Sequence, residues 1–260
     1  MIIILTVLIG MCVGSFLNVV IYRLPRGMSL IYPSSHCPTC NNKIRWYDNI
    51  PIFSFIFLKG KCRDCGSKIS TRYPIVEMIN ALLYFLSLCL YTNYVFPSGQ
   101  NIFVFVVSCV IFSCLICVFF CDLDNMEIPD ELQVALLICG LILLIFSVDV
   151  SMNIYGFLFG GGFFLLFSIV YKLIRKKDGL GFGDVKLMAV LGLILGLYKT
   201  ILLTIVSCVS CAVIMSIVTL VKRGKGDREF PFATFIAPCA VLCMALGDIV
   251  VNWYLSLVAL

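Results

Sequence analysis

The chain has 260 residues, of which 62% are hydrophobic and only 13% charged, and its formal net charge is +5. Its mean hydropathy is +1.09, whereas a soluble domain carries roughly a quarter charged residues. Apolar stretches long enough to cross a bilayer recur along the whole length. This composition excludes a soluble globular protein and predicts an all-α polytopic membrane protein.

The hydropathy pattern predicts about eight transmembrane helices, of which the sixth is the shortest. No basic residue precedes the first apolar stretch, and that stretch is too long for a signal peptide, so we expect it to be retained. Three parts follow from the pattern: a first transmembrane helix (1–22), a polar loop (23–72) and a helical membrane domain (73–260). The expected spans are 1–22, 73–94, 101–121, 131–148, 153–173, 184–198, 200–221 and 232–257.

The basic residues predict the orientation. Nine Lys or Arg lie between residues 23 and 72, four between 172 and 177, and four between 222 and 228. Eight spans place these three loops on one side, which the positive-inside rule assigns to the cytoplasm. The acidic loop 122–130 falls on the same side.

Two aspartates at that face are the candidate catalytic residues. Asp122 closes the third apolar run within "CDLDNMEIPDEL", and Asp184 opens the sixth within "GLGFGDVKL". Alone, Asp122 is a loop acid or an intramembrane functional group, and Asp184 is a helix N-cap or the acid of a GxGD motif. Together they predict an aspartyl dyad that shares one proton and activates a water molecule.

Helix dipoles suggest how the dyad shares its proton. Asp122 lies at a predicted helix C-terminus, which disfavours negative charge, with Asp124 close by. Asp184 lies at a predicted N-terminus, two residues before Lys186. We therefore expect Asp122 to hold the proton and Asp184 to be the ionised base.

Four of the fifteen cysteines form a predicted metal site. Two CxxC pairs, "CPTC" and "CRDC", are separated by 21 residues in the polar loop, and this spacing is typical of a structural tetrathiolate zinc site. A redox pair or incidental cysteines are the alternatives, and nearby basic residues would favour thiolates. The expected ligands are Cys37, Cys40, Cys62 and Cys65.

Three other acids have simpler interpretations. Glu77 and Asp248 lie within predicted spans, where we expect each to make a polar contact between helices. Asp178 is interpreted as loop surface or as a support for Asp184.

These motifs together resemble one family. "GSFLNVVIYRLPRG", the paired CxxC loop, "DLDNMEIPD" and "GLGFGDVKLMA" occur in the order and spacing of the bacterial type IV prepilin peptidases. These are bifunctional leader peptidase/N-methyltransferases, and belong to the GxGD intramembrane aspartyl proteases of family A24. The resemblance runs from about residue 10 to about residue 240.

The resemblance implies a function. The substrates would be prepilins and pseudopilins, cut after the Gly that ends a short basic leader, on the cytoplasmic side of the bacterial inner membrane. Asp122 and Asp184 would be the catalytic aspartates, and 73–260 the peptidase domain. The new N-terminal amine would then be methylated with S-adenosylmethionine, although no nucleotide-binding fingerprint marks its site.

One segment departs from the family pattern. Where the family usually has Pro-Phe-Gly-Pro, Ala233 and Thr234 follow Phe232 in this chain. A peptidase without methyltransferase activity, an ion-coupled transporter and a membrane scaffold are the alternatives. Nothing in the sequence indicates a nucleic-acid partner or specifies an oligomeric state.

Overall fold

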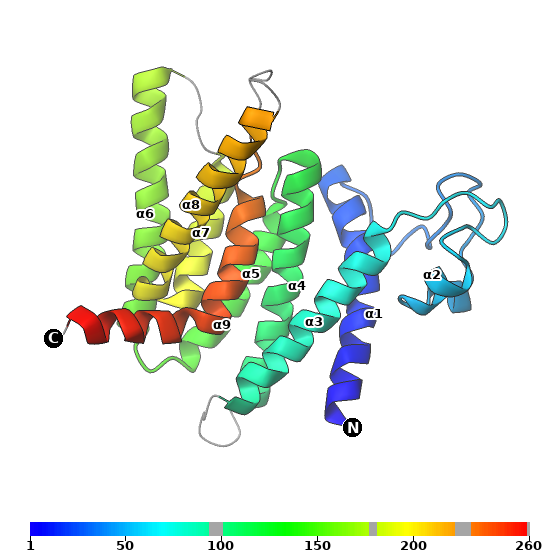
Figure 1. Ribbon diagram of the computed structural model, residues 1–260, viewed down its shortest axis with the longest axis horizontal. Helices are drawn as coiled ribbons and strands as arrows, with labels where there is room; N and C mark the ends of the chain where they lie inside the picture. The colour runs from blue at the N-terminus through cyan, green and yellow to red at the C-terminus, as the bar shows by residue number, and fades with distance from the viewer. Residues whose placement is uncertain (94–100, 177–180, 222–229, 259–260) are drawn as a thin grey trace. The chain divides into compact units, whose positions relative to one another are not determined.

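The computed structural model describes residues 1–93, 101–176, 181–221 and 230–258, and this part of the chain is helical without a β-strand (Figure 1). Each of the eight predicted spans corresponds to one long helix, so the all-α membrane fold is confirmed. The long helices are α1 (Ile2–Arg23), α3 (Arg72–Asn93), α4 (Asn101–Asn125), α5 (Asp130–Ile145), α6 (Val150–Arg175), α7 (Phe182–Leu195), α8 (Leu197–Val221) and α9 (Ala233–Val258).

Six of these helices are long and apolar enough to cross a membrane. The other two, α5 and α7, have 16 and 14 residues, which at 1.5 Å per residue are shorter than a hydrocarbon core of about 30 Å. The count of eight spans therefore stays a prediction. The basic loop 222–228, Lys177 and Asp178 lie outside the described residues.

The described residues form two compact units, Met1–Cys117 and Val118–Leu260, and the division falls within α4. It follows the packing of the helices and does not test the predicted three-part organisation, which stays a prediction.

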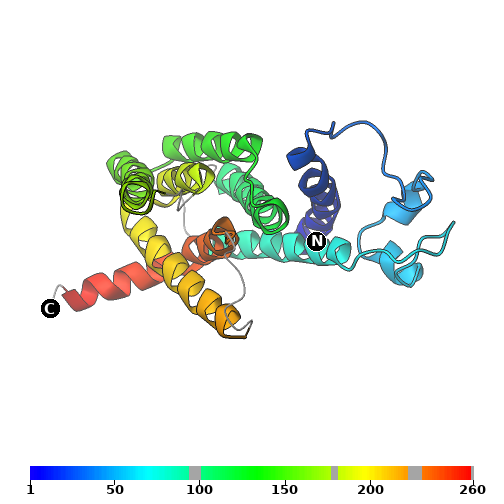
Figure 2. The same cartoon turned by 90° about the horizontal axis from the view of Figure 1, so that it is seen from above.

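In the first unit, α1 and α3 pack closely and antiparallel (Figures 1 and 2). Two glycines one turn apart on α1 allow this approach, because a Cβ on Gly10 would lie 2.8 Å from the Cα of Ala81, and a Cβ on Gly14 2.7 Å from the Cα of Glu77. Such small residues bring helix backbones together in membranes. The 24–71 segment carries the short helices η1 (Leu24–Arg26), η2 (Trp46–Asn49) and α2 (Phe53–Phe57).

Buried amide side chains also join α1 to α3. The Asn80 amide donates to the Gly10 carbonyl oxygen at 2.7 Å, and Asn18 donates to the Tyr73 carbonyl oxygen at 3.3 Å. Ser113 of α4 donates to Asn80 Oδ1 at 3.0 Å. These polar groups therefore have partners where no water is available to bind them.

In the second unit, α7 is the central helix. It packs against α5, α6, α8 and α9, and most of its residues are buried. Gly156 and Gly160 of α6 face Gly192 and the Met188 carbonyl of α7, and the order of these contacts makes the two helices antiparallel. A helix that is apolar all round fits this buried position.

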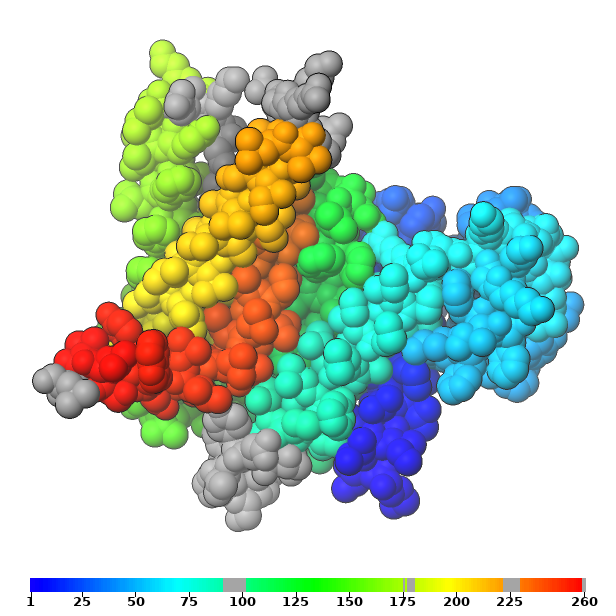
Figure 3. Space-filling model, in the orientation of Figure 1, coloured from blue at the N-terminus to red at the C-terminus, as the bar shows by residue number. Residues whose placement is uncertain are grey.

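The neighbours of α7 complete the second unit. Helix α5 runs parallel to α7, because Gln133 contacts Gly183 and Gly140 contacts Leu193. Helix α8 crosses α9, and both are visible on the face shown in Figure 3. An exposed apolar stripe along α8 is suited to contact lipid; it consists of Ile205, Val209, Val213 and Ile217.

Candidate active site and metal centre

Asp122 lies in the last turns of α4, and only 4% of its surface is exposed. Its Oδ2 accepts hydrogen bonds from the backbone N–H of Thr234 at 2.7 Å and from the Thr234 hydroxyl at 3.0 Å. Thr234 is in the first turn of α9, where backbone N–H groups have no partner within the helix. The N-terminus of α9 thus holds this carboxylate in one orientation.

Asp184 is the third residue of α7 and is also buried. Gly181, not Asp184, occupies the N-cap position, and its N–H donates to the Asp184 carboxylate. A Cβ on Gly181 would lie 3.4 Å from Asp184 Oδ2, an ordinary van der Waals contact, so the approach does not require a glycine here. The simple N-cap interpretation of Asp184 is therefore wrong.

The fold brings the two aspartates together. Both lie in the second unit, and their carboxyl groups are close enough to interact electrostatically. They come from the end of α4 and the start of α7, far apart in the sequence. Sharing of one proton between them stays a prediction.

Two contacts fasten the first turn of α5 to the first turn of α7. Lys186 Nζ forms an exposed ion pair with Asp130 Oδ1 at 2.8 Å. Gln133, which is 5% exposed, donates from Nε2 to the Gly183 carbonyl oxygen at 3.4 Å. Its Oε1 is buried without a partner among the described residues. The Asp184 turn is thus held by a neighbouring helix.

These contacts remove support for the expected sharing of the proton. The Lys186 ammonium is paired with Asp130, so its charge is not directed at Asp184 alone. The two Thr234 donors and the positive end of the α9 dipole favour charge on Asp122. These donors oppose the effect of the negative end of the α4 dipole, which was the reason to expect that Asp122 holds the proton.

The four predicted metal ligands form one cluster in the first unit. The Sγ atoms of Cys37, Cys40, Cys62 and Cys65 all lie within 4.8 Å of one another. A tetrahedral zinc with Zn–S bonds of about 2.3 Å places its sulfurs about 3.8 Å apart, and Cys37 Sγ lies 3.8 Å from Cys65 Sγ. The cluster can hold a metal ion such as zinc.

Both halves of the cluster have the same local structure. Each CxxC begins a CxxCxxKI sequence, with an isolated β-bridge across it, His36 to Lys43 and Lys61 to Lys68. The first Cys N–H bonds the residue five positions later in each half. Asn41 and Gly66 occupy equivalent positions with φ of 57° and 70°. This eight-residue repeat is visible in the sequence but was not predicted from it.

Backbone N–H groups, more than the basic side chains, favour a thiolate in this cluster. The N–H groups of Cys40 and Thr39, with the Ser67 hydroxyl, lower the pKa of the Cys37 thiol to about 6. Arg63 is instead paired with Asp48 at 2.6 Å, and this pairing lowers the pKa of the Asp48 carboxyl. Arg63, which lies within the second CxxC pair, therefore pairs with a carboxylate and not with a thiolate.

The predicted polar contacts of Glu77 and Asp248 are confirmed. Glu77 of α3 accepts a hydrogen bond from the Ser15 hydroxyl of α1 as well as from the Ile52 N–H at 2.7 Å, and Asp248 pairs with Lys199 between α9 and α8 at 3.0 Å. Asp178 lies outside the described residues, so its predicted role stays untested.

Two family models match the chain. The Bacterial Peptidase A24 N-terminal domain matches residues 8–91, and the Type IV leader peptidase family matches residues 109–216. A protein of Aeromonas salmonicida named prepilin leader peptidase/N-methyltransferase is 31% identical over 97% of this chain and 93% of its own length. The chain belongs to the type IV leader peptidase family.

Other members of this family agree with that match. Proteins with the same name from Neisseria gonorrhoeae and Pseudomonas aeruginosa are 32% and 30% identical, over 97% and 96% of this chain and 94% and 92% of their own lengths. No solved structure matches the chain. Asp122 and Asp184 fall within the leader peptidase match, and the four cysteines fall within the N-terminal match. Thr234, which donates hydrogen bonds to Asp122, lies outside both matched regions. It was not predicted to be a site residue.

Proposed function

We propose that this protein is a prepilin leader peptidase and N-methyltransferase of the bacterial inner membrane. The observation that carries the proposal is the pair of buried carboxyl groups, Asp122 and Asp184, from helix ends of one compact unit. The names of its relatives supply the substrate class. The basic loop 23–72 supports a cytoplasmic location for the metal centre, and the same rule places the dyad at the cytoplasmic face.

In the proposed reaction, the aspartates add water across the peptide bond after the leader glycine. The ionised carboxylate takes a proton from the water as the oxygen attacks the scissile carbonyl carbon, and the other carboxyl protonates the carbonyl oxygen. When the tetrahedral intermediate collapses, the C–N bond breaks, the amine nitrogen takes the proton that the first carboxylate removed from the water, and a hydroxyl of the intermediate returns a proton to the second carboxylate. Thr234 and Gly181 keep the two carboxyl groups oriented through these transfers.

The acidic segment after Asp122 supports recognition of a basic leader. Glu127 and Glu131 are exposed, whereas Asp130 is paired with Lys186. Basic leader residues would be attracted to the exposed carboxylates while the substrate helix stays in lipid. We therefore expect the leader to approach the dyad along this segment.

Methylation is the second proposed activity. S-adenosylmethionine would supply a methyl group on a sulfonium, to be attacked by the new N-terminal amine. The C–S bond breaks as the N–C bond forms, and the amine loses a proton. The zinc ion is proposed to be structural, because four thiolates complete a tetrahedral site and leave no open position.

Cleavage of a prepilin with a basic, glycine-ending leader tests the proposal. Purified protein in lipid would be compared with Asp122→Asn and Asp184→Asn, and mass spectrometry would follow the product with and without S-adenosylmethionine. Both substitutions should abolish cleavage, whereas Asp248→Asn, which changes an acid outside the dyad, should retain it. Wild-type product should gain the mass of a methyl group only with the methyl donor present.

Three results would contradict parts of this proposal. Cleavage that survives both substitutions would refute the dyad. Cleavage by wild type without the added methyl mass would leave a peptidase alone. No cleavage by folded wild type, together with ion uptake into vesicles, would support a transporter instead.

A further inference from the structure

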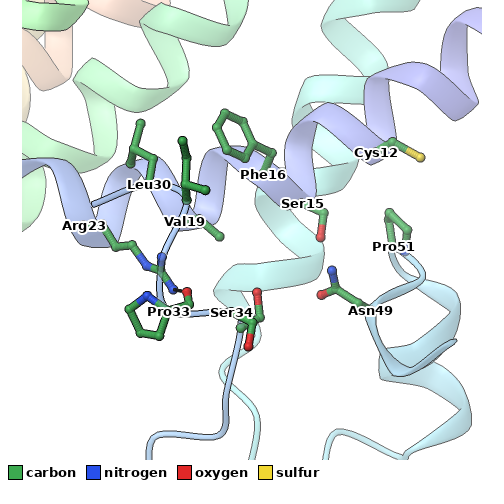
Figure 4. Close-up of a pocket in the computed structure, with 12 residues that line it drawn as sticks. Cys12, Ser15, Phe16, Val19, Arg23, Leu30, Pro33, Ser34, Asn49 and Pro51 are labelled. Carbon is green, nitrogen blue, oxygen red and sulfur yellow. Dashed lines mark hydrogen bonds between the residues drawn. The ribbon is translucent and has the colours of Figure 1, made fainter. Parts of the chain in front are cut away.

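A cavity of about 390 Å³ lies in the first unit, between one side of α1 and the segments that follow it (Figure 4). Its size is within the range of small-molecule sites. It is lined by α1 from Cys12 to Arg23, by residues 30–35 and by Asn49 and Pro51. Nothing in the aspartyl chemistry described above uses this cavity.

One end of the cavity carries a buried cation. Arg23 is 6% exposed, and its guanidinium donates to the carbonyl oxygens of Ser29 at 3.0 Å and Pro33 at 2.6 Å. Among the residues that the structure describes, no carboxylate lies within ion-pair distance of it. A buried guanidinium with only neutral partners favours an anionic group on a ligand.

The opposite end has a buried carboxylate behind its wall. Glu77 is 6% exposed and accepts hydrogen bonds from the Ile52 N–H and the Ser15 hydroxyl. Ser15 and Pro51, the neighbour of Ile52, both line the cavity. The cavity therefore has a positive group at one end and a negative group near the other.

Both polar and apolar groups line the cavity between these ends. Ser34 and Asn49 point toward the open centre in Figure 4, and Phe16 forms part of the wall. A membrane lipid is polar at its headgroup and apolar beyond it, so it would leave the polar groups at one end unpaired. A ligand that is polar along its length fits better.

We propose that this cavity binds S-adenosylmethionine, with the α-carboxylate on Arg23 and the cationic part directed toward Glu77. This inference rests on the methyltransferase part of the proposed function and gives it a site. It places the methyl donor in the first unit, on the α1 face nearest the segment that carries the cysteine cluster. It also gives Glu77 a charge role beyond its contact with Ile52.

Direct binding tests the site without any turnover. Titration calorimetry would measure the Kd of S-adenosylmethionine for the full chain in nanodiscs of zwitterionic lipid. Arg23→Met should weaken binding at least tenfold, because the carboxylate loses its cation. Val19→Trp, which fills the cavity without changing a charge, should weaken it similarly. Metal content and the midpoint of thermal unfolding would verify that each variant is folded.

Two further comparisons make the test specific. Arg26→Met is the matched control, because Arg26 is exposed and its guanidinium stacks on Tyr22 at 4.3 Å, and it should leave Kd unchanged. Glu77→Gln should weaken S-adenosylmethionine more than S-adenosylhomocysteine, which lacks the sulfonium charge. Equal weakening of both ligands would overturn the predicted direction of the ligand.

Failure of the site and failure of the function are distinguishable. A wild type that binds and uses the methyl donor, with Kd unaffected by Arg23→Met and Val19→Trp, would refute the site alone. A wild type that cleaves prepilin but neither binds the donor nor methylates would refute the methyltransferase activity. If Arg23→Met abolished binding of anionic phosphatidylglycerol and left the Kd of the methyl donor unchanged, the cavity would be a lipid site.

Discussion

Thr234 is the residue on which the geometry of Asp122 depends most directly. Its N–H and hydroxyl both donate to the same carboxylate oxygen. The Pro-Phe-Gly-Pro pattern of the resemblance would place proline here, and proline could supply neither donor. In this chain a departure from the family pattern therefore becomes a contact of the candidate active site.

Removing the Thr234 hydroxyl should impair cleavage more than folding. Thr234→Val keeps the backbone donor and the side-chain volume but loses one hydrogen bond to a carboxylate, and we expect kcat to fall about tenfold. Thr234→Ser should restore most of the activity. Cleavage kinetics and thermal unfolding would be measured together.

Thr219→Val is the control for this substitution, because the Thr219 hydroxyl bonds to the Met215 carbonyl oxygen of its own helix. An unchanged kcat in Thr234→Val would show that the backbone N–H alone orients Asp122.

At the scale of helices, the α6–α7 contact determines where Asp184 lies. A Cβ on Gly192 would overlap the carbonyl oxygen of Gly156, which belongs to the backbone and cannot turn away. Because Asp184 is in the first turn of α7, any shift of that helix moves the carboxyl group. The glycines of the membrane helices thus act on the site from a distance.

Gly192→Ala should destabilise the second unit by about 1–3 kcal/mol and reduce leader cleavage. Gly162→Ala on α6 is the matched control, because a Cβ there would meet nothing within 4 Å, and alanine favours helix. Thermal unfolding in nanodiscs and cleavage rates would be compared. Equal stability of the two variants would contradict close backbone packing.

The helices themselves could be predicted because each is a continuous apolar run. The contacts that each helix makes with other helices could not be predicted. The contact between Asp122 and Thr234 joins residues 112 positions apart, and neither lies on a periodic pattern that indicates the other. The central position of α7 was also not predictable, since a helix apolar on all sides gives no direction for packing.

At the scale of the whole molecule, the cysteine cluster links segments that contain little regular structure. The four cysteines were predicted from spacing alone, since a CxxC turn is local, and the structure brings their sulfurs together. The cavity could not be predicted, because Arg23, Ser34 and Asn49 share no sequence motif. Only folding of the loop against α1 places them around one cavity.

Metal removal should therefore affect the two proposed activities unequally. Metal analysis of purified protein should give one zinc per chain. Cys37→Ser should lower zinc content and methylation, because the loop that lines the cavity loses its cross-link, and should change cleavage less. Cys208→Ser, at an exposed membrane cysteine, is the control. Absence of zinc in active protein would contradict the assignment.

The two CxxCxxKI turns have equivalent β-bridges and hydrogen bonds, and each has a residue with positive φ at the same position. Such equivalence is what a duplicated segment would leave behind, with Asn41 and Gly66 as two solutions to one backbone requirement. The halves should then be exchangeable parts. A chimeric chain in which residues 62–69 carry the sequence of residues 37–44 should still fold around one zinc ion, even though four of those eight residues change.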